Sequence, residues 1–188
     1  LEARPFATGI KIIKWHRREY ILADTSANDA GCYGCQLWLD TTIPLTCIGD
    51  EYATRSDVTL PSRDCRALVA RLQTRSFSVL FVVAHGPHIG SGDATSTDVF
   101  WQSLEEIVIR CRRAKDSVVL LVDANAQIHS VRPVCVAHAT PFRNFMQNLG
   151  IQDVTAGSDG LGMRTFIGNG ASCQLDYVGL DSHSKAID

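Results

Sequence analysis

Val-Leu-Leu-Val-Asp-Ala-Asn-Ala, residues 119–126, is the most informative segment of this chain. Four aliphatic residues in a row are typical of a strand that is buried on both faces. This strand ends on Asp123 and Asn125, and strand ends are where α/β folds present their functional groups. The segment therefore predicts an α/β fold with Asp123 and Asn125 in its active site. The alternative is that the two residues only shape the turn after the strand.

Two other predicted strands end in a similar way. Residues 79–84 are apolar and run into His85, and residues 174–178 carry Asp176 within a short strand. Three strands thus each deliver a titratable group at or near one end, which indicates that these groups share one site. The alternatives are an ordinary loop histidine at His85 and an Asp176 that is paired with an arginine.

Composition places the chain among ordinary globular proteins. It has 188 residues, 45% hydrophobic and 20% charged, which is enough for one domain with a sizeable core. The net charge of −2 gives no support to nucleic-acid binding. Basic residues nevertheless cluster within 11–18 and 110–115, either as solvated faces or as contacts to phosphate. Charge therefore leaves the class of substrate open.

The seven cysteines are spread without a framework spacing. This is typical of reduced thiols in an intracellular protein, so we expect a nuclear or cytoplasmic location. Cys32 and Cys35 form a lone C-x-x-C pair, whereas a zinc site would require further ligands at a recognised spacing. Because no stretch is apolar enough to span a membrane, we expect no membrane association. We also expect no obligate protein partner.

The remaining pattern predicts mixed sheets covered by helices. Residues 2–18 are expected to form a loop and a short helix, and residues 41–61 an irregular segment. Apolar side chains at helical spacing, among them Phe100, Leu104 and Ile107, predict a helix after residue 96. A second helix is predicted over 140–149, and strands are predicted over 20–26, 36–40, 66–72, 77–84, 117–123, 164–167 and 174–180.

The residue types at these strand ends suit the hydrolysis of a phosphate ester. That reaction needs a metal ion to offset phosphoryl charge, a group that activates water and a group that donates to the leaving oxygen. Asp123 suits the water, Asn125 can donate to the phosphate, and His85 titrates in the range of a general acid. Asp176 could orient a second histidine or bind metal. Glu2, otherwise an ordinary surface residue, could hold Mg²⁺.

Five short motifs follow one another along the chain. They are 1–4 (Leu-Glu-Ala-Arg), 34–39 (Gly-Cys-Gln-Leu-Trp-Leu), 84–87 (Ala-His-Gly-Pro), 122–126 (Val-Asp-Ala-Asn-Ala) and 175–178 (Leu-Asp-Tyr-Val). In this order they resemble the endonuclease/exonuclease/phosphatase superfamily, and its deoxyribonuclease-like members in particular. Each motif is short, and it is their order and spacing over essentially the whole chain that make the resemblance specific.

The resemblance implies an α/β fold of two mixed β-sheets packed face to face and flanked by helices, a four-layer sandwich. It also implies a bound Mg²⁺ or Mn²⁺, with one acidic residue as the metal ligand. The segment 164–166 is similar to one that often precedes the family's Asp-Tyr strand. The residues assigned in this way are Glu2 to the metal, His85, Asp123, Asn125 and Asp176 to catalysis, and Asn125, Arg164 and Thr165 to substrate binding.

The chain departs from the family's pattern at both ends. The family's first strand would lie before Leu1, and its terminal Ser-Asp-His strand would follow Asp188. Val122 also stands where the family has a glycine before the catalytic aspartate. We therefore expect residues 1–188 to be one incomplete domain of this superfamily, in which Asp176 lacks its histidine partner. Activity is expected of the intact domain.

Three functions are compatible with these observations. The first is a Mg²⁺-dependent DNA endonuclease of the LINE-type retrotransposon kind, with DNA rather than RNA as its partner, because segments 84–87 and 34–38 look closest to those members. The second is a phosphatase or phosphodiesterase that acts on lipid or small phosphate esters. The third is a non-catalytic remnant that serves as an interaction surface. Activity that is insensitive to salt would favour the second function over the first.

Overall fold

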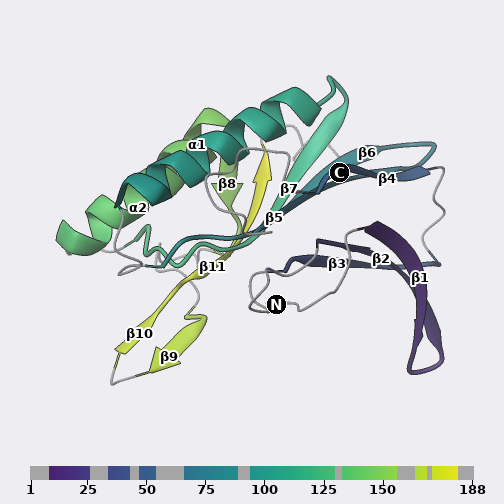
Figure 1. Ribbon diagram of the computed structural model, residues 1–188, viewed down its shortest axis with the longest axis horizontal. Helices are drawn as coiled ribbons and strands as arrows, with labels where there is room; N and C mark the ends of the chain where they lie inside the picture. Colours follow the sequence, from purple (N-terminus) through teal and green to yellow (C-terminus); the bar gives the residue numbers. More distant parts are fainter. Residues whose placement is uncertain are drawn as a thin grey trace.

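Two larger β-sheets, a two-stranded ribbon and two helices make up the part of the chain that the computed structural model describes (Figure 1). The sheets pack face to face, and both helices cover the outer face of the larger sheet. This α/β sandwich is the fold that the sequence predicted, and three of its layers lie within the described residues. Those residues are 9–25, 34–42, 47–53, 66–88, 94–129, 133–155, 164–168 and 171–181.

The larger sheet has six strands in the order β4-β5-β6-β7-β11-β8. Strands β6 and β7 are parallel, and every other neighbouring pair is antiparallel. Because β8 is antiparallel to β11, and β11 to β7, the strands β6, β7 and β8 all run in one direction. Their bounds are β4 (Cys47–Ala53), β5 (Ala67–Gln73), β6 (Ser78–His85), β7 (Asp116–Asp123), β8 (Ile151–Asp153) and β11 (Asp176–Asp181).

The smaller sheet is an antiparallel meander of β1 (Gly9–Trp15), β2 (Arg18–Asp24) and β3 (Gln36–Asp40). The strands predicted over 20–26 and 36–40 are confirmed as β2 and β3, which pair with each other. The short helix expected within 2–18 is wrong for the described part of that segment, because residues 9–18 form β1 and the turn into β2. Strand β1 is rich in isoleucine and ends on a tryptophan, residue types that favour strands. The turn to β2 has positive φ at His16 and Arg17, the geometry that suits a two-residue hairpin.

Strand β4 corrects the irregular segment expected over 41–61. It lies at one end of the strand order and pairs with β5, with a register shift between Asp50 and Tyr52. Such a bulge interrupts the alternation of side chains between the two faces. The alternating pattern by which a strand is recognised in a sequence is therefore interrupted within β4, although β4 pairs with β5 over its length.

Helices α1 (Ala94–Cys111) and α2 (Pro133–Asn148) lie side by side on the larger sheet. The predicted inward face of α1 is buried, with Phe100, Leu104 and Ile107 at most 4% exposed. Helix α2 begins at Pro133, well before the predicted start at 140. Proline is tolerated at the first position of a helix, so Pro133 is compatible with this earlier start. The end of α2 follows the prediction: Gly150 adopts a left-handed φ of 67°, which glycine favours after a helix.

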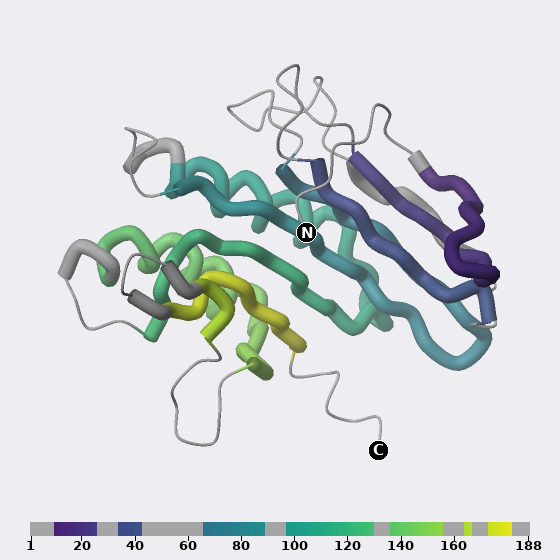
Figure 2. Tube along the Cα trace, turned by 90° about the horizontal axis from the view of Figure 1, so that it is seen from below, coloured from purple at the N-terminus to yellow at the C-terminus, as the bar shows by residue number. Residues whose placement is uncertain are grey.

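Two hydrophobic cores lie on the two faces of the larger sheet, whose backbone Figure 2 shows from the side of the smaller sheet. The first, between the sheet and the helices, contains Trp101, Phe142 and Tyr177. The second, between the two sheets, is formed by side chains of β2, β3 and β5 with partly buried residues of β6 and β7. Val122 belongs to the first core and Leu121 packs against the second. Both faces of the segment that ends at Asp123 are therefore covered, as predicted.

A two-stranded ribbon, β9 (Phe166–Gly168) and β10 (Ala171–Cys173), precedes β11. It confirms the short strand predicted near 164–167. Within the residues described here, no helix is both long and apolar enough to cross a membrane. The nuclear or cytoplasmic location stays a prediction.

Candidate active site

Three of the predicted catalytic residues form a row on adjacent strands of the larger sheet. His85 at the end of β6 is the register neighbour of Asp123 at the end of β7, and Asp123 is the neighbour of Asp176 at the start of β11. Register neighbours project from the same face of a sheet. Residues two positions back on this face, Val83 and Leu121, pack against the core between the sheets. The row therefore lies where β6 and β7 end and β11 begins, which we call the edge of the sheet, and it is on the face toward the smaller sheet.

His85 and Asp123 are the most closely associated pair in this row. Nε2 of His85 lies 3.6 Å from Oδ2 of Asp123, and the side chains are 13% and 35% exposed. Burial raises the pKa of Asp123, and the charge of Asp176 adds to this. The N–H of Asn125 and the charges of His85 and His88 act in the opposite direction without cancelling the shift. A carboxylate with a raised pKa is a stronger base than a solvated one, which suits the activation of water.

Asn125 is held in an unusual backbone conformation beside this pair. Its φ is 50°, a left-handed value that asparagine adopts more readily than most residues. The residue is 7% exposed, and its Nδ2 donates to the carbonyl oxygen of Gly86 at 2.9 Å. One N–H of the predicted phosphate-binding amide is thus committed to the loop after His85. An asparagine amide has a second N–H donor.

The loop after His85 packs closely against the loop after Asp123. The N–H of Gly86 donates to the carbonyl of Asp123 at 2.7 Å. A Cβ at Gly86 would come within 2.6 Å of the Ala124 carbonyl oxygen and 2.8 Å of the Trp101 ring. Only glycine fits at this position. The predicted motif at 84–87 therefore has a structural role beside the catalytic role of its histidine.

Two histidines near this site were not predicted from the sequence. The exposed His88 has its ring centroid 5.5 Å from that of His85. His138 of α2 lies beside the backbone of Pro87 and of Asn125, and burial lowers its pKa. The position of His88, three residues after His85 in one loop, was a usable signal. His138 gave no signal, because helix packing brings it to the site.

The other predicted residues lie at or beyond the margin of the row. Asp176 is exposed, and its N–H donates to Oγ1 of Thr165 at 3.0 Å. Oγ1 of Thr165 also accepts the N–H of Leu175 at 2.9 Å, so it positions the start of β11. Arg164 is exposed beside it. Glu2, the predicted metal ligand, lies outside the described residues.

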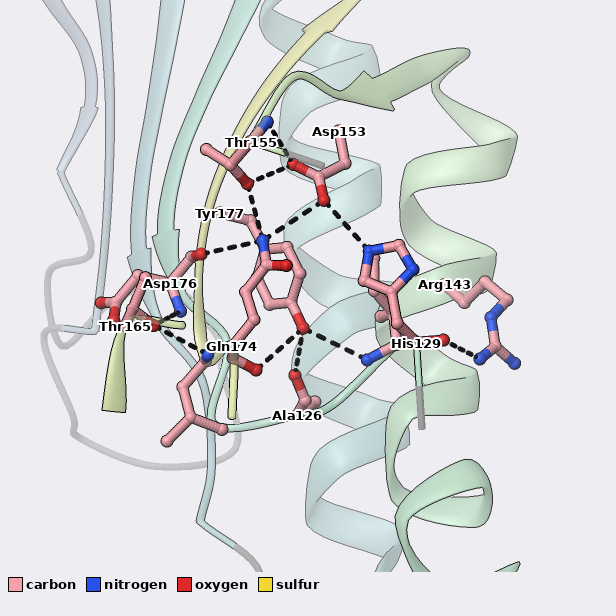
Figure 3. Close-up of polar contacts among 11 residues, drawn as sticks. Ala126, His129, Arg143, Asp153, Thr155, Thr165, Gln174, Asp176 and Tyr177 are labelled. Carbon is pink, nitrogen blue, oxygen red and sulfur yellow. Dashed lines mark hydrogen bonds and ion pairs between the residues drawn. The ribbon is translucent and has the colours of Figure 1, made fainter. Parts of the chain in front are cut away.

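Tyr177 fixes the loop that follows Asn125 (Figure 3). Its hydroxyl is close to two carbonyl oxygens, of Ala126 at 2.7 Å and of Gln174 at 3.1 Å, and accepts the N–H of Ile128 at 3.2 Å. Burial raises its pKa to about 12, so the phenol keeps its proton at neutral pH. Residues on both faces of β11 thus contribute to the site. Asp176 belongs to the row, and Tyr177 lies on the opposite face, in the core under the helices.

The donor set at this edge suits a hard divalent cation in part. Asp123 and Asp176 are cross-strand neighbours, and after burial the charge of Asp176 is a cause of the raised pKa of Asp123. A divalent cation would relieve this repulsion, and Mg²⁺ typically takes one or two carboxylates together with water. Among the described residues, no group of three or more His, Cys, Asp or Glu side chains is placed to hold a metal ion.

No protein-family model and no curated protein matches the sequence. Solved structures do match the fold. The endonuclease domain of TRAS1, a telomere-specific non-LTR retrotransposon, is 14% identical with a TM-score of 0.60, over 86% of this chain and 67% of that one. TDP2 of D. rerio, complexed with a single-strand DNA product, is 14% identical with a TM-score of 0.55, over 90% of this chain and 64% of that one.

An endonuclease/exonuclease/phosphatase family protein from Leptotrichia buccalis is 16% identical with a TM-score of 0.52, over 87% of this chain and 60% of that one. At such low identities these likenesses establish the fold alone. It is the fold of the endonuclease/exonuclease/phosphatase superfamily, as the sequence predicted. The chain spans between 60% and 67% of the three structures, and the predicted strands beyond either end stay a prediction.

Proposed function

We propose that this protein hydrolyses phosphodiester bonds in a metal-dependent reaction and acts on DNA as an endonuclease. The observation that carries the proposal is the row of His85, Asp123 and Asp176 on adjacent strands and one face. A carboxylate beside an imidazole supplies a base and an acid for the two proton transfers of hydrolysis. The choice of DNA is supported by the fold, since TRAS1 has an endonuclease domain of this fold and TDP2 was solved with a DNA product.

In the proposed reaction, Asp123 orients a water molecule and accepts its proton while the water oxygen bonds to phosphorus. The bond from phosphorus to the leaving oxygen breaks, and a protonated His85 donates its proton to that oxygen. Asn125 donates its second N–H to a phosphoryl oxygen. Glu2, with the carboxylates at this edge, would hold Mg²⁺ or Mn²⁺, which offsets negative charge on the phosphoryl oxygens when bound.

The raised pKa of Asp123 gives this proposal a pH dependence. Burial makes the carboxyl harder to ionise, and only the ionised form accepts a proton from water. Activity is therefore expected to fall on the acid side as pH drops through a pKa above the usual value for aspartate of about 3.9.

Nicking of supercoiled plasmid tests the proposal. The 188-residue chain and a form extended at both ends along its gene are each assayed with Mg²⁺, with chelator and as the Asp123→Ala variant. We expect Mg²⁺-dependent nicking that falls by about 10² to 10⁴-fold in the variant. Thermal unfolding of each form serves as the control for folding.

Three outcomes are informative. Nicking by the extended form alone would support the function and show that activity requires the added segments. Nicking that survives Asp123→Ala or chelator would contradict the assigned roles. Folded protein that nicks in no form would end the endonuclease proposal and turn attention to small phosphate esters.

A further inference from the structure

A second polar group lies near the same edge of the larger sheet as the catalytic row, on its other face. Strands β6, β7 and β8 run in one direction, and β8 ends at Asp153, which is level with Gly179 of β11 and Leu120 of β7, three residues before the row. Asp153 is the register neighbour of Gly179 on β11, an odd number of residues from Asp176. Side chains alternate along a strand, so Asp153 faces the helices rather than the smaller sheet.

The carboxylate of Asp153 is rigidly held (Figure 3). It is 7% exposed, and its Oδ1 accepts the N–H of Thr155 at 2.8 Å and the hydroxyl of the same residue. Its Oδ2 lies 3.3 Å from Nε2 of Gln174 and 3.3 Å from Nε2 of His129. An anchored, buried carboxylate that faces one nitrogen of an imidazole determines the orientation of that ring.

The backbone next to His129 is held from two sides. The N–H of Ile128 donates to the Tyr177 hydroxyl at 3.2 Å, and its carbonyl accepts from Nη2 of Arg143 at 2.6 Å. The side chain of His129 is nevertheless 34% exposed. The imidazole is therefore fixed in place while part of it stays in contact with solvent.

This arrangement gives the ring a defined chemistry. Because Nε2 faces a carboxylate, it is the nitrogen that carries a proton in the neutral ring. In the charged ring a second N–H is present at Nδ1, which points away from Asp153. A charged imidazole that donates outward beside the guanidinium of Arg143 is suited to an anionic oxygen. Asp153 lies two strands from Asp123 and three residues further back along the strand direction, which together correspond to about 14 Å.

We propose that His129, oriented by Asp153, contacts a backbone phosphate of the nucleic acid that flanks the phosphate to be cleaved. This inference rests on the proposed function. The separation from Asp123 excludes the scissile phosphate and places the contact on another nucleotide of the same nucleic acid. His129 and Asp153 then form a positioning pair that sets the path of the strand across the edge of the sheet.

The contact depends on pH, because only the charged ring donates from Nδ1. Among the described residues, Asp153 on β8 contacts the ring of His129, and Arg143 on α2 and Tyr177 on β11 contact the backbone of the preceding residue, Ile128. The guanidinium stays charged and Tyr177, with a pKa of about 12, stays neutral. We therefore expect tighter binding at pH 6 than at pH 8.

The test measures DNA binding without cleavage. Fluorescence anisotropy of a labelled duplex oligonucleotide in EDTA gives the binding constant of the full chain as a function of salt at both pH values. His129→Gln keeps an N–H near the position of Nε2 and removes the charge at Nδ1. We expect it to reduce the slope of log K against log salt by about 1 at pH 6 and to leave binding at pH 8 unchanged. Asp153→Asn, which removes the orienting charge, is expected to reduce the slope in the same way.

The matched control is Arg75→Gln, an exposed charge in the turn at the opposite end of β6, which should leave the slope unchanged. Equal slopes for wild type and His129→Gln at pH 6, in a protein that binds DNA, would overturn the positioning pair and leave the endonuclease proposal intact. Failure of the wild type to bind DNA at any salt concentration would overturn both. A lower unfolding temperature with an unchanged slope would indicate a structural role only, and also overturns the pair.

Discussion

Asp123 has a structural and a chemical role within one carboxylate. Its Oδ1 accepts the N–H of Asn125 at 3.0 Å, which forms the tight turn after β7, and its Oδ2 faces His85. The sequence offered these as alternatives, a turn-shaping residue or a catalytic one. The structure shows the turn directly, and the same hydrogen bond orients the second oxygen toward the imidazole. A turn and a base are therefore compatible at this position.

Gly86→Ala is expected to disrupt the site through the backbone. The added Cβ would lie 2.6 Å from the Ala124 carbonyl oxygen and 2.8 Å from the Trp101 ring, so the loop after His85 must move. We expect a loss of about 1 to 3 kcal/mol in the free energy of unfolding, together with reduced nicking. Urea denaturation and the plasmid assay measure the two effects.

Gly150→Ala provides the comparison. Its φ of 67° strains any other residue, but a Cβ there meets no atom within 4 Å. It should lose about 1 to 2 kcal/mol of stability and keep full nicking per folded molecule. If both variants lost activity in proportion to stability alone, close packing at Gly86 would have no specific effect on the site.

Strand β11 connects the two faces of the larger sheet at the candidate site. Asp176 belongs to the row that faces the smaller sheet, whereas the next residue, Tyr177, lies in the core under the helices. Thr165 positions the backbone at the start of the strand through two hydrogen bonds to Oγ1. The predicted substrate contact of Thr165 stays a prediction, and its observed hydrogen bonds give it a structural role.

Tyr177→Phe tests how far this strand stabilises the loop after Asn125. The substitution leaves the N–H of Ile128 and the carbonyl of Ala126 without the hydroxyl that they share. Leaving buried polar groups unsatisfied costs about 1 to 3 kcal/mol, which urea denaturation can measure. Tyr20→Phe on the smaller sheet is the matched control and should be close to neutral. Equal effects of the two substitutions would contradict the role of the Tyr177 hydroxyl.

The buried ion pair that stabilises the larger sheet and the candidate catalytic residues lie at opposite ends of its strands. At the end opposite the candidate site, Arg71 of β5 and Asp116 of β7 form an ion pair at 2.8 Å with both side chains 1% exposed. Ser78 at the start of β6 donates to the same carboxylate at 2.6 Å. Burial acts to raise the pKa of Asp116, but the hydrogen bonds from Arg71 and Ser78 outweigh this effect and lower the pKa. These contacts tie together the starts of the strands whose ends carry His85 and Asp123.

Asp116→Asn is expected to destabilise the whole molecule without altering its chemistry. The substitution leaves a buried guanidinium without its counter-charge, which costs about 3 to 5 kcal/mol. Because the folded pKa of Asp116 is depressed, its stabilisation is fully present above the usual pKa of about 3.9 and is lost as pH falls through the folded value. Denaturation midpoints of both forms from pH 2 to 8 should approach one another as pH falls below about 3.9, and a difference that stayed constant over this range would contradict this linkage.

Local patterns were sufficient to predict several elements and their polar ends. The aliphatic runs before His85 and Asp123 identified β6 and β7, and the spacing of Phe100, Leu104 and Ile107 identified the buried face of α1. These elements follow from residue type and period within a short window, which is information that the sequence carries. The strand at β1 was missed because its pairing with β2, rather than any alternation of its own, determines its structure.

The candidate site depends on distant parts of the chain. Parallel pairing of β6 with β7 and antiparallel pairing of β11 place His85, Asp123 and Asp176 in one row, and short sequence windows carry no signal for such pairings. The contacts of His138 and of the His129–Asp153 pair arise in the same way, from the packing of α2 and β8 at this edge. The residue types needed for the chemistry are thus present in the sequence, whereas their proximity results from strand order and helix packing, which depend on burying surface across the whole molecule.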